Sequence, residues 1–127
     1  MALRPGLSGS ATMVVTDVDT ATALGTGDVP VVATPSIVAL AEQATIATIG
    51  SELDEGTTSV GYRVQLDHLA PTGLGGELAA EAILESVESR RLTFRVSVSD
   101  GRGLVAAGRI TRVVVERARF LEKAAGA

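Results

Sequence analysis

Apolar side chains lie on nearly every side of a helix drawn through residues 34–50, so this segment predicts a long buried helix. Thr34 suits the N-cap position, and Pro35 suits the first helical position, where no backbone N–H is needed. Gly50 suits the end of the helix. The single ionisable residue of the segment is Glu42. Burying its carboxylate is costly unless a partner or a proton neutralises the charge.

Alternating apolar and polar residues predict strands before and after this helix, because side chains along a strand point to opposite faces in turn. The clearest strand covers residues 57–70, with Gly61 on one face and His68 on the other, apolar face. That apolar face consists of Val60, Tyr62, Val64, Leu66, His68 and Ala70. Further strands are predicted at residues 7–18, 77–88, 92–99 and 104–115, with a loop at 19–30 and a charged tail at 117–127 that begins as a helix.

Residues 77–88 also suit a helix by composition, but the strands and short turns on both sides favour a strand joined by hairpins to both neighbours. The predicted order is therefore a strand, a loop, the buried helix and four antiparallel strands. Because so apolar a helix cannot lie on the outside, the simplest arrangement wraps the sheet around it. This predicts a single α+β domain over residues 1–127 with the hotdog fold, a curved antiparallel sheet of about five strands around one long central helix. Sheet edges invite pairing, so we expect a dimer formed side by side.

Composition narrows the range of functions. The chain has 127 residues and a net charge of −4, which argues against nucleic-acid binding because that usually requires a basic face. It has no cysteine and one histidine, His68, so neither thiolate nor multi-histidine metal sites are expected within one chain. The N-terminus lacks the apolar core of a signal sequence, and no stretch reaches membrane-spanning length. We therefore expect a cytoplasmic protein with no membrane contact.

Three side chains combine into a candidate catalytic site: Thr34 at the start of the helix, Glu42 eight residues later, and His68 on the inward face of the next strand. An inward imidazole and an inward carboxylate are expected to pair, which favours the imidazolium and stabilises the carboxylate. A nearby hydroxyl can then act as a nucleophile or position a water. Each residue also has a structural interpretation, in which Thr34 caps the helix, Glu42 faces an interface or solvent gap, and His68 is a satisfied core residue.

Several motifs, distributed from about residue 4 to residue 123, resemble those of one known family. The motifs are VATP at residues 32–35, Ala41-Glu42, SVGY at 59–62, HLAPTG at 68–73, SRRLTFRVS at 89–97 and Asp100-Gly101. Together they resemble the fluoroacetyl-CoA thioesterase family of hotdog proteins.

The resemblance implies a homodimeric acyl-CoA thioesterase without a cofactor, in which coenzyme A is part of the substrate. The catalytic threonine, glutamate and histidine of the family fall on Thr34, Glu42 and His68. The glycine of its acyl pocket falls on Gly61, and its substrate-contacting arginine falls on Arg112. Without the resemblance, Arg112 would be interpreted as a solvated strand residue and Gly61 as a mark of a bulge or close packing.

One segment departs from the family pattern. Fluoroacetyl-specific members carry phenylalanines in the loop before the threonine, whereas residues 23–30 contain no aromatic side chain. The expected substrate is therefore a small or medium acyl thioester of coenzyme A or of an acyl carrier. Two alternatives are a hotdog hydratase or dehydratase acting on enoyl thioesters and a non-catalytic protein that binds acyl thioesters.

Overall fold

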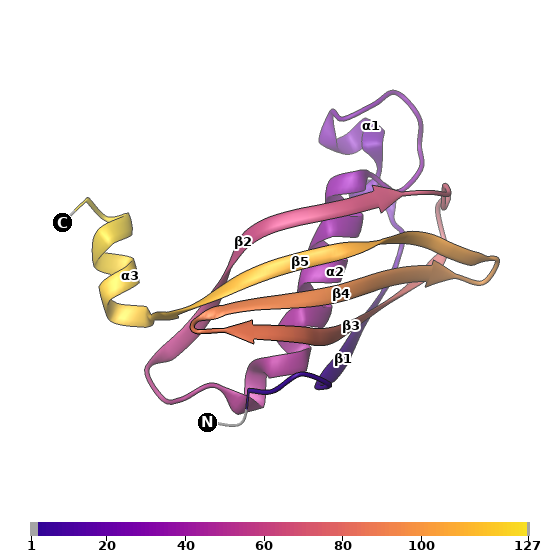
Figure 1. Ribbon diagram of the computed structural model, residues 1–127. Coiled ribbons are helices and arrows are strands. Elements are labelled where there is room, and N and C mark those ends of the chain that lie inside the picture. The colour runs from indigo at the N-terminus through magenta and orange to yellow at the C-terminus, as the bar shows by residue number, and fades with distance from the viewer. Residues whose placement is uncertain (1–2, 127) are drawn as a thin grey trace.

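The computed structural model describes residues 3–126, in which one curved antiparallel sheet packs against the long helix α2 (Figure 1). The strands are β1 (Ser8–Val14), β2 (Thr57–His68), β3 (Glu77–Glu88), β4 (Arg91–Asp100) and β5 (Gly103–Glu116). The helices are α1 (Ala21–Leu24), α2 (Thr34–Ile49) and α3 (Arg117–Ala124), with short 3-10 turns at Asp17–Asp19 and Gly50–Glu52. The described chain has the predicted α+β hotdog fold.

The strand order across the sheet is β1-β3-β4-β5-β2, which makes β1 and β2 the two edges. The expected hairpin between the second and third strands is therefore wrong, because β2 pairs with β5 and not with β3. The segment between β2 and β3 instead crosses the end of the sheet. The backbone N–H of Val32 donates to the carbonyl of Thr72 over 2.8 Å, so this crossing segment is tied to the chain that enters α2.

The inner face of the sheet follows the alternation of the sequence. Strand β3 begins and ends at the predicted residues, and alternate residues from Leu78 to Leu84 are buried on its inner face, whereas Ile83 is exposed on the outer face. The buried positions of β3 and β4 are Leu78, Ala80, Ala82, Leu84, Leu92, Phe94, Val96 and Val98. Burial of these side chains, at roughly 1.5–3 kcal/mol for each large one, is what holds α2 to the sheet.

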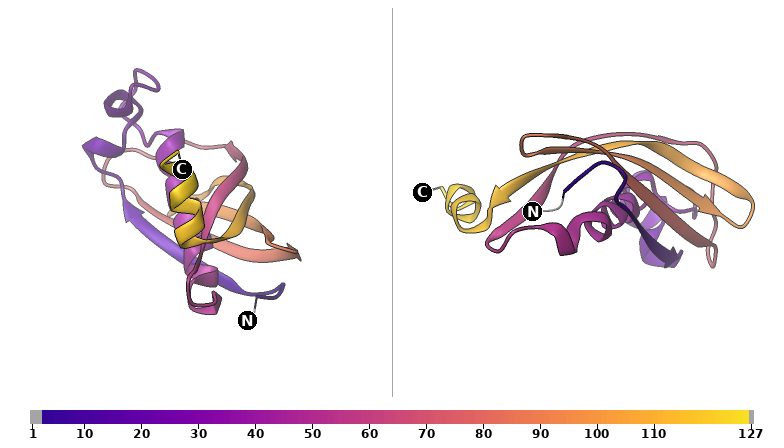
Figure 2. Two further views of the ribbon diagram at one scale, coloured as in Figure 1. Left: turned by 90° about the vertical axis from the view of Figure 1, so that its left-hand side faces the viewer. Right: turned by 60° about the horizontal axis from the view of Figure 1, so that its bottom comes forward.

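Helix α2 has the predicted length, but two expectations about it are wrong. Ala33 and not Thr34 is the N-cap residue, so Thr34 is the first residue inside the helix. The helix is also not buried on all sides, because the sheet arches over one side of it only (Figure 2). Ile46, for example, is 50% exposed on the open side.

Strand β2 contains a β-bulge between Gly61 and Arg63, which leaves Tyr62 as an extra residue. The bulge reverses the alternation, and residues opposite one another in antiparallel strands share a face. Gly61 opposite Arg112 and His68 opposite Ala106 therefore lie on the same inner face. The prediction that Gly61 and His68 lie on opposite faces is wrong for this reason.

Tyr62 lies on the outer face and not on the predicted inner one. The Arg91 guanidinium lies 4.8 Å and that of Arg63 lies 5.5 Å from the centroid of its ring. These cation–π contacts stabilise an exposed aromatic residue on the wet face of the sheet.

The C-terminal helix α3 continues directly from β5 and stands away from the sheet, with no buried residue of its own (Figure 1). This confirms the prediction that the charged tail begins as a helix. Within residues 3–126, no helix combines the length and apolar character that crossing a membrane requires.

Candidate active site

Thr34 and His68 meet at one end of the molecule. Thr34 begins α2, His68 ends β2, and the threonine Oγ1 lies 2.8 Å from the imidazole Nδ1, within hydrogen-bond distance. Thr34 is held there because the chain before it is anchored: the Ala33 N–H and the Ser36 hydroxyl both donate to the carbonyl of Asp19. The Thr34 hydroxyl is thus free of helix capping and available to the imidazole.

The second nitrogen of His68 has no hydrogen-bond partner within residues 3–126. Its Nε2 is buried, and no hydrogen-bond partner reaches it among the described residues. A buried polar atom without a partner costs roughly 1–3 kcal/mol, so native proteins rarely keep one without a use for it. A ligand or a group from another subunit is a natural partner for this nitrogen.

Glu42 forms an ion pair with Arg112 and no contact with His68. Its Oε2 lies 3.0 Å from the Arg112 Nη1, and the arginine side chain is only 6% exposed. Burial lowers the pKa of Arg112, while the Glu42 charge and hydrogen bond oppose that shift. The expected pairing of Glu42 with His68 is therefore wrong, because a second buried charge, absent from the sequence argument, provides the counter-charge.

Ser59 fixes the other side of the arginine. The Arg112 Nε donates to the Ser59 Oγ over 2.9 Å, and Nη2 donates to the Ser59 carbonyl over 3.0 Å. With Glu42 on Nη1, the guanidinium has a partner on each of its three nitrogens. A planar guanidinium held by three acceptors has a fixed orientation, so Ser59 and Arg112 together set where the carboxylate lies.

Gly61 allows the carboxylate to approach the strand. A Cβ atom built on Gly61 would lie 2.8 Å from the Oε2 of Glu42, closer than real Cβ contacts. The glycine is needed here for close approach and not for an unusual backbone angle. Glu42, Arg112, Ser59 and Gly61 thus form one compact cluster, which we call the carboxylate cluster.

The carboxylate cluster and the Thr34–His68 pair lie apart within one chain. Glu42 is eight residues from Thr34 on the same helix, about 12 Å along the axis. His68 is seven residues from Gly61 on β2, roughly 20 Å along the strand. The structure therefore brings the five predicted site residues together in two groups and not in one. No three His, Cys, Asp or Glu side chains among residues 3–126 are placed to hold a metal ion.

Comparison with known proteins identifies the family of this chain. A family model described as fluoroacetyl-CoA-specific thioesterase matches residues 15–118. The fluoroacetyl-CoA thioesterase of Streptantibioticus cattleyicolor is 36% identical over 93 residues, which cover 73% of this chain and 67% of that protein. The chain belongs to this family. It is accordingly a thioester hydrolase.

Solved structures of the same family have the same fold. The fluoroacetyl-CoA thioesterase FlK superposes with a TM-score of 0.92 at 30% identity, covering 99% of this chain and 98% of that one. A variant of FlK in complex with acetyl-CoA superposes with a TM-score of 0.92 at 29% identity, covering 98% of both chains.

One residue of the carboxylate cluster was not predicted from the sequence. Ser59 lies within the SVGY motif, but no role was predicted for it. Its position two residues before Gly61 places both on the same face of the strand, since the bulge comes only after Gly61. This spacing was the available signal, and it becomes useful only once Arg112 is known to lie opposite Gly61.

Proposed function

We propose that this protein is a homodimeric acyl-CoA thioesterase, and that each active site combines the Thr34–His68 pair of one subunit with the carboxylate cluster of the other. The observation that carries the proposal is the 2.8 Å contact between the Thr34 hydroxyl and an imidazole whose other nitrogen is buried and unpartnered. This is the geometry of a nucleophile beside its general base.

The edge strand β2 supports the dimer. It has 12 residues, lies at the edge of the sheet, and is exposed from Gly61 to Gln65. A long unprotected edge with free backbone donors and acceptors pairs readily with another strand. With a two-fold axis, β2 of one subunit would pair with β2 of the other in antiparallel orientation. Isologous contacts of this kind use the same surface of both subunits.

The register of such pairing would place the carboxylate cluster of one subunit beside the Thr34–His68 pair of the other. If β2 pairs with its copy about an axis at Arg63 or Val64, the middle of the exposed stretch, His68 lies opposite residue 58 or 60 of the partner. Ser59 of the partner subunit then lies within one residue of the position opposite His68, and Gly61 of the partner subunit lies within three. The carboxylate cluster, which is separated from His68 along one chain, is adjacent to it across the dimer.

The chemistry follows from these positions. The Thr34 Oγ1 attacks the thioester carbonyl carbon while His68 takes the hydroxyl proton. The Gly61 N–H of the partner subunit and the free N–H groups at the start of α2 stabilise the oxyanion. The C–S bond then breaks, and the coenzyme A thiolate takes the proton from His68. A water, oriented by Glu42 of the partner subunit, hydrolyses the threonine ester, returning the proton to Thr34 and releasing the acid.

The segment before α2 supports a substrate with a small or medium acyl group. Residues 25–30 are exposed and, together with α1, contain no aromatic side chain that could close over a very small acyl group. The related structure that holds acetyl-CoA supports a coenzyme A ester as the substrate class.

A thiol-release assay over a panel of acyl-CoAs of increasing chain length tests the function. We expect turnover of short and medium chains by the wild-type protein and a loss of about 100-fold or more in kcat for Thr34→Ala and His68→Ala. Binding of acyl-CoAs without thiol release, or unchanged rates in both variants, would contradict the proposal. Hydration of an enoyl-CoA without thiol release would favour the hydratase alternative.

A further inference from the structure

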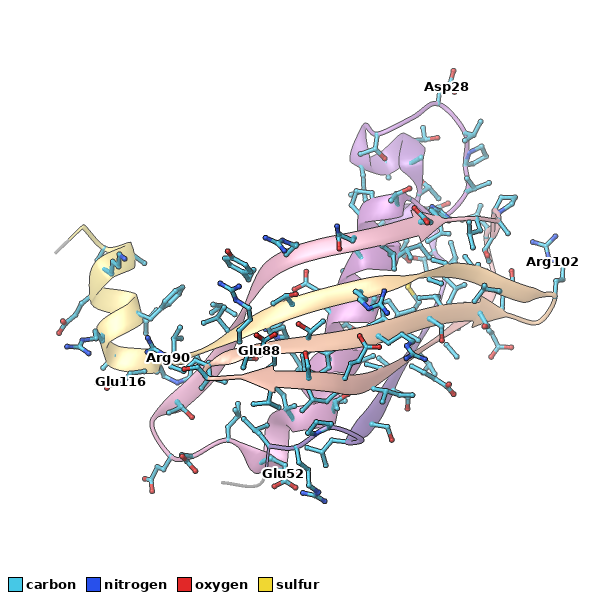
Figure 3. All side chains as sticks on the ribbon, viewed as in Figure 1. Asp28, Glu52, Glu88, Arg90, Arg102 and Glu116 are labelled. Carbon is cyan, nitrogen blue, oxygen red and sulfur yellow. The ribbon has the colours of Figure 1, made fainter. Side chains whose placement is uncertain are left out.

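A cavity of about 520 Å³ lies between α3 and the end of the sheet, outside the residues assigned to catalysis. It is lined by Arg90, Val115, Glu116, Arg119, Phe120, Glu122 and Lys123. Figure 3 shows Arg90, at the turn after β3, and Glu116, at the end of β5, close to the start of α3. Its volume is within the range of small-molecule sites.

Three cations face this cavity on a protein whose net charge is −4. The side chains of Arg90, Arg119 and Lys123 make no hydrogen bond or ion pair within the described chain, unlike Arg95 and Arg109, which both contact Glu85. Unpaired guanidinium groups beside an ammonium group are a typical arrangement for binding phosphate, because arginine can donate two parallel hydrogen bonds.

The remaining lining suits the rest of a nucleotide. Phe120 is 39% exposed and offers an aromatic face on which a base can stack. Glu116 and Glu122 also line the cavity, and their carboxylates can accept hydrogen bonds from ribose hydroxyls or a base amino group.

We infer that this cavity binds the nucleotide end of the coenzyme A thioester, with Arg90, Arg119 and Lys123 on its phosphate groups and Phe120 on its adenine. The inference rests on the proposed function, because it gives the substrate of that function a second point of attachment. It also specifies the substrate class as free coenzyme A esters, since an acyl-carrier thioester has no adenine nucleotide.

The position of the cavity agrees with this role. Glu116 follows Arg112 by four residues on β5, about 13 Å along the strand. Arg112 lies opposite Gly61, and Glu116 lies opposite Thr57 at the start of β2. One strand thus connects the carboxylate cluster to the cavity, as a ligand with a thioester at one end and phosphates at the other requires.

The first test is independent of catalysis. The nucleotide half of coenzyme A, adenosine carrying the ribose phosphate and the pyrophosphate, is titrated into the full-length protein by calorimetry. We expect binding to the wild type and a loss of about tenfold in affinity for Arg119→Ala and for Lys123→Ala, as for the loss of one charge-assisted hydrogen bond. Because α3 has no buried residue, these substitutions leave the core intact.

Arg117→Ala is the matched control, since it removes the same charge from the same helix but not from the lining of the cavity. We expect it to bind the nucleotide like the wild type. Absence of binding by the wild type, equal binding by Arg119→Ala, or an equal loss in Arg117→Ala would each overturn the inference.

The second test uses turnover. Arg119→Ala is expected to raise the KM for an acyl-CoA with kcat unchanged, and to leave the kinetics with the corresponding acyl-pantetheine unaltered. An equal effect on both substrates would show that Arg119 does not act on the nucleotide. If no thioester is hydrolysed while the nucleotide still binds at this cavity, the proposed function fails and the cavity assignment stands.

Discussion

Arg112 holds Glu42 through an ion pair of 3.0 Å between Nη1 and Oε2, and the arginine is the more buried of the two. Loss of either partner is expected to lower stability, because removal of one charge leaves the other in a poorly solvated position. The consequences for stability differ from those of an ion pair on the surface.

Arg112→Ala is expected to lower the free energy of unfolding by roughly 2–3 kcal/mol, less than for a fully buried pair because Glu42 is 32% exposed. Urea denaturation followed by circular dichroism measures the change. Arg109→Ala is the control, since Arg109 also pairs with a glutamate but is 56% exposed, and a clearly smaller loss is expected there. Equal losses for the two variants would contradict the structural role of Arg112.

Ser59→Ala is expected to leave the fold intact but to loosen the guanidinium of Arg112. The substitution removes the hydroxyl acceptor of residue 59 and leaves its carbonyl acceptor in place. We expect kcat to fall about tenfold, since the carboxylate held by Arg112 loses its fixed position. Ser59→Thr, which keeps the hydroxyl, is expected to restore most of the rate. A loss in Ser59→Ala that Ser59→Thr does not rescue would indicate a steric role and not a hydrogen-bonding one.

Gly61→Ala tests the close approach of Glu42 to β2. The new Cβ would lie 2.8 Å from Oε2, so the carboxylate must move, and a decrease in kcat of about 10- to 100-fold is expected. Gly50→Ala is the matched control, because its φ of −55° is helical and no atom lies within 4 Å of the added Cβ. Equal kinetics for Gly61→Ala and wild type would remove the carboxylate cluster from the mechanism.

Physical reasons explain which strands could be predicted from the sequence and which could not. Alternation identified β3 and β4 because buried and more exposed residues alternate along most of each strand, in β3 up to a bulge at Glu85. It failed on β2, where one additional residue, Tyr62, reverses the alternation without any change in composition. The position of β2 beside β5 was not predictable from local patterns, because strand order depends on contacts between distant segments.

The candidate site was also predicted only in part. Thr34 and His68 were predicted to meet, and they do, because Thr34 begins α2 and His68 ends β2 at the same end of the molecule. The partner of Glu42 was not predicted, because Arg112 resembles a solvated strand residue until β5 is placed between β4 and β2.

Glu85 predicts a pH dependence on the outer face of the sheet. Hydrogen bonds from Arg109 and then Arg95 lower its pKa from 4.5 to about 2. A carboxyl group whose pKa is lower in the folded state stabilises the protein above its unfolded pKa, and this contribution is lost as the pH falls toward the folded pKa. The melting temperature of wild type should therefore exceed that of Glu85→Gln at pH 7, and the difference should shrink between about pH 4.5 and pH 2. A difference that does not change over this range would contradict the lowered pKa.

Subunit complementation tests whether the active site is shared. If each site uses Thr34 of one subunit and Glu42 of the other, then Thr34→Ala and Glu42→Ala homodimers each lack both sites. A mixed dimer contains one site with both substitutions and one intact site. Random exchange makes half of the dimers mixed, so the mixture should recover about a quarter of wild-type activity. If Thr34 and Glu42 acted within one subunit, every site would lack one of them and mixing would recover nothing. Thr34→Ala mixed with His68→Ala is the control, because these residues come from the same subunit, and no recovery is expected.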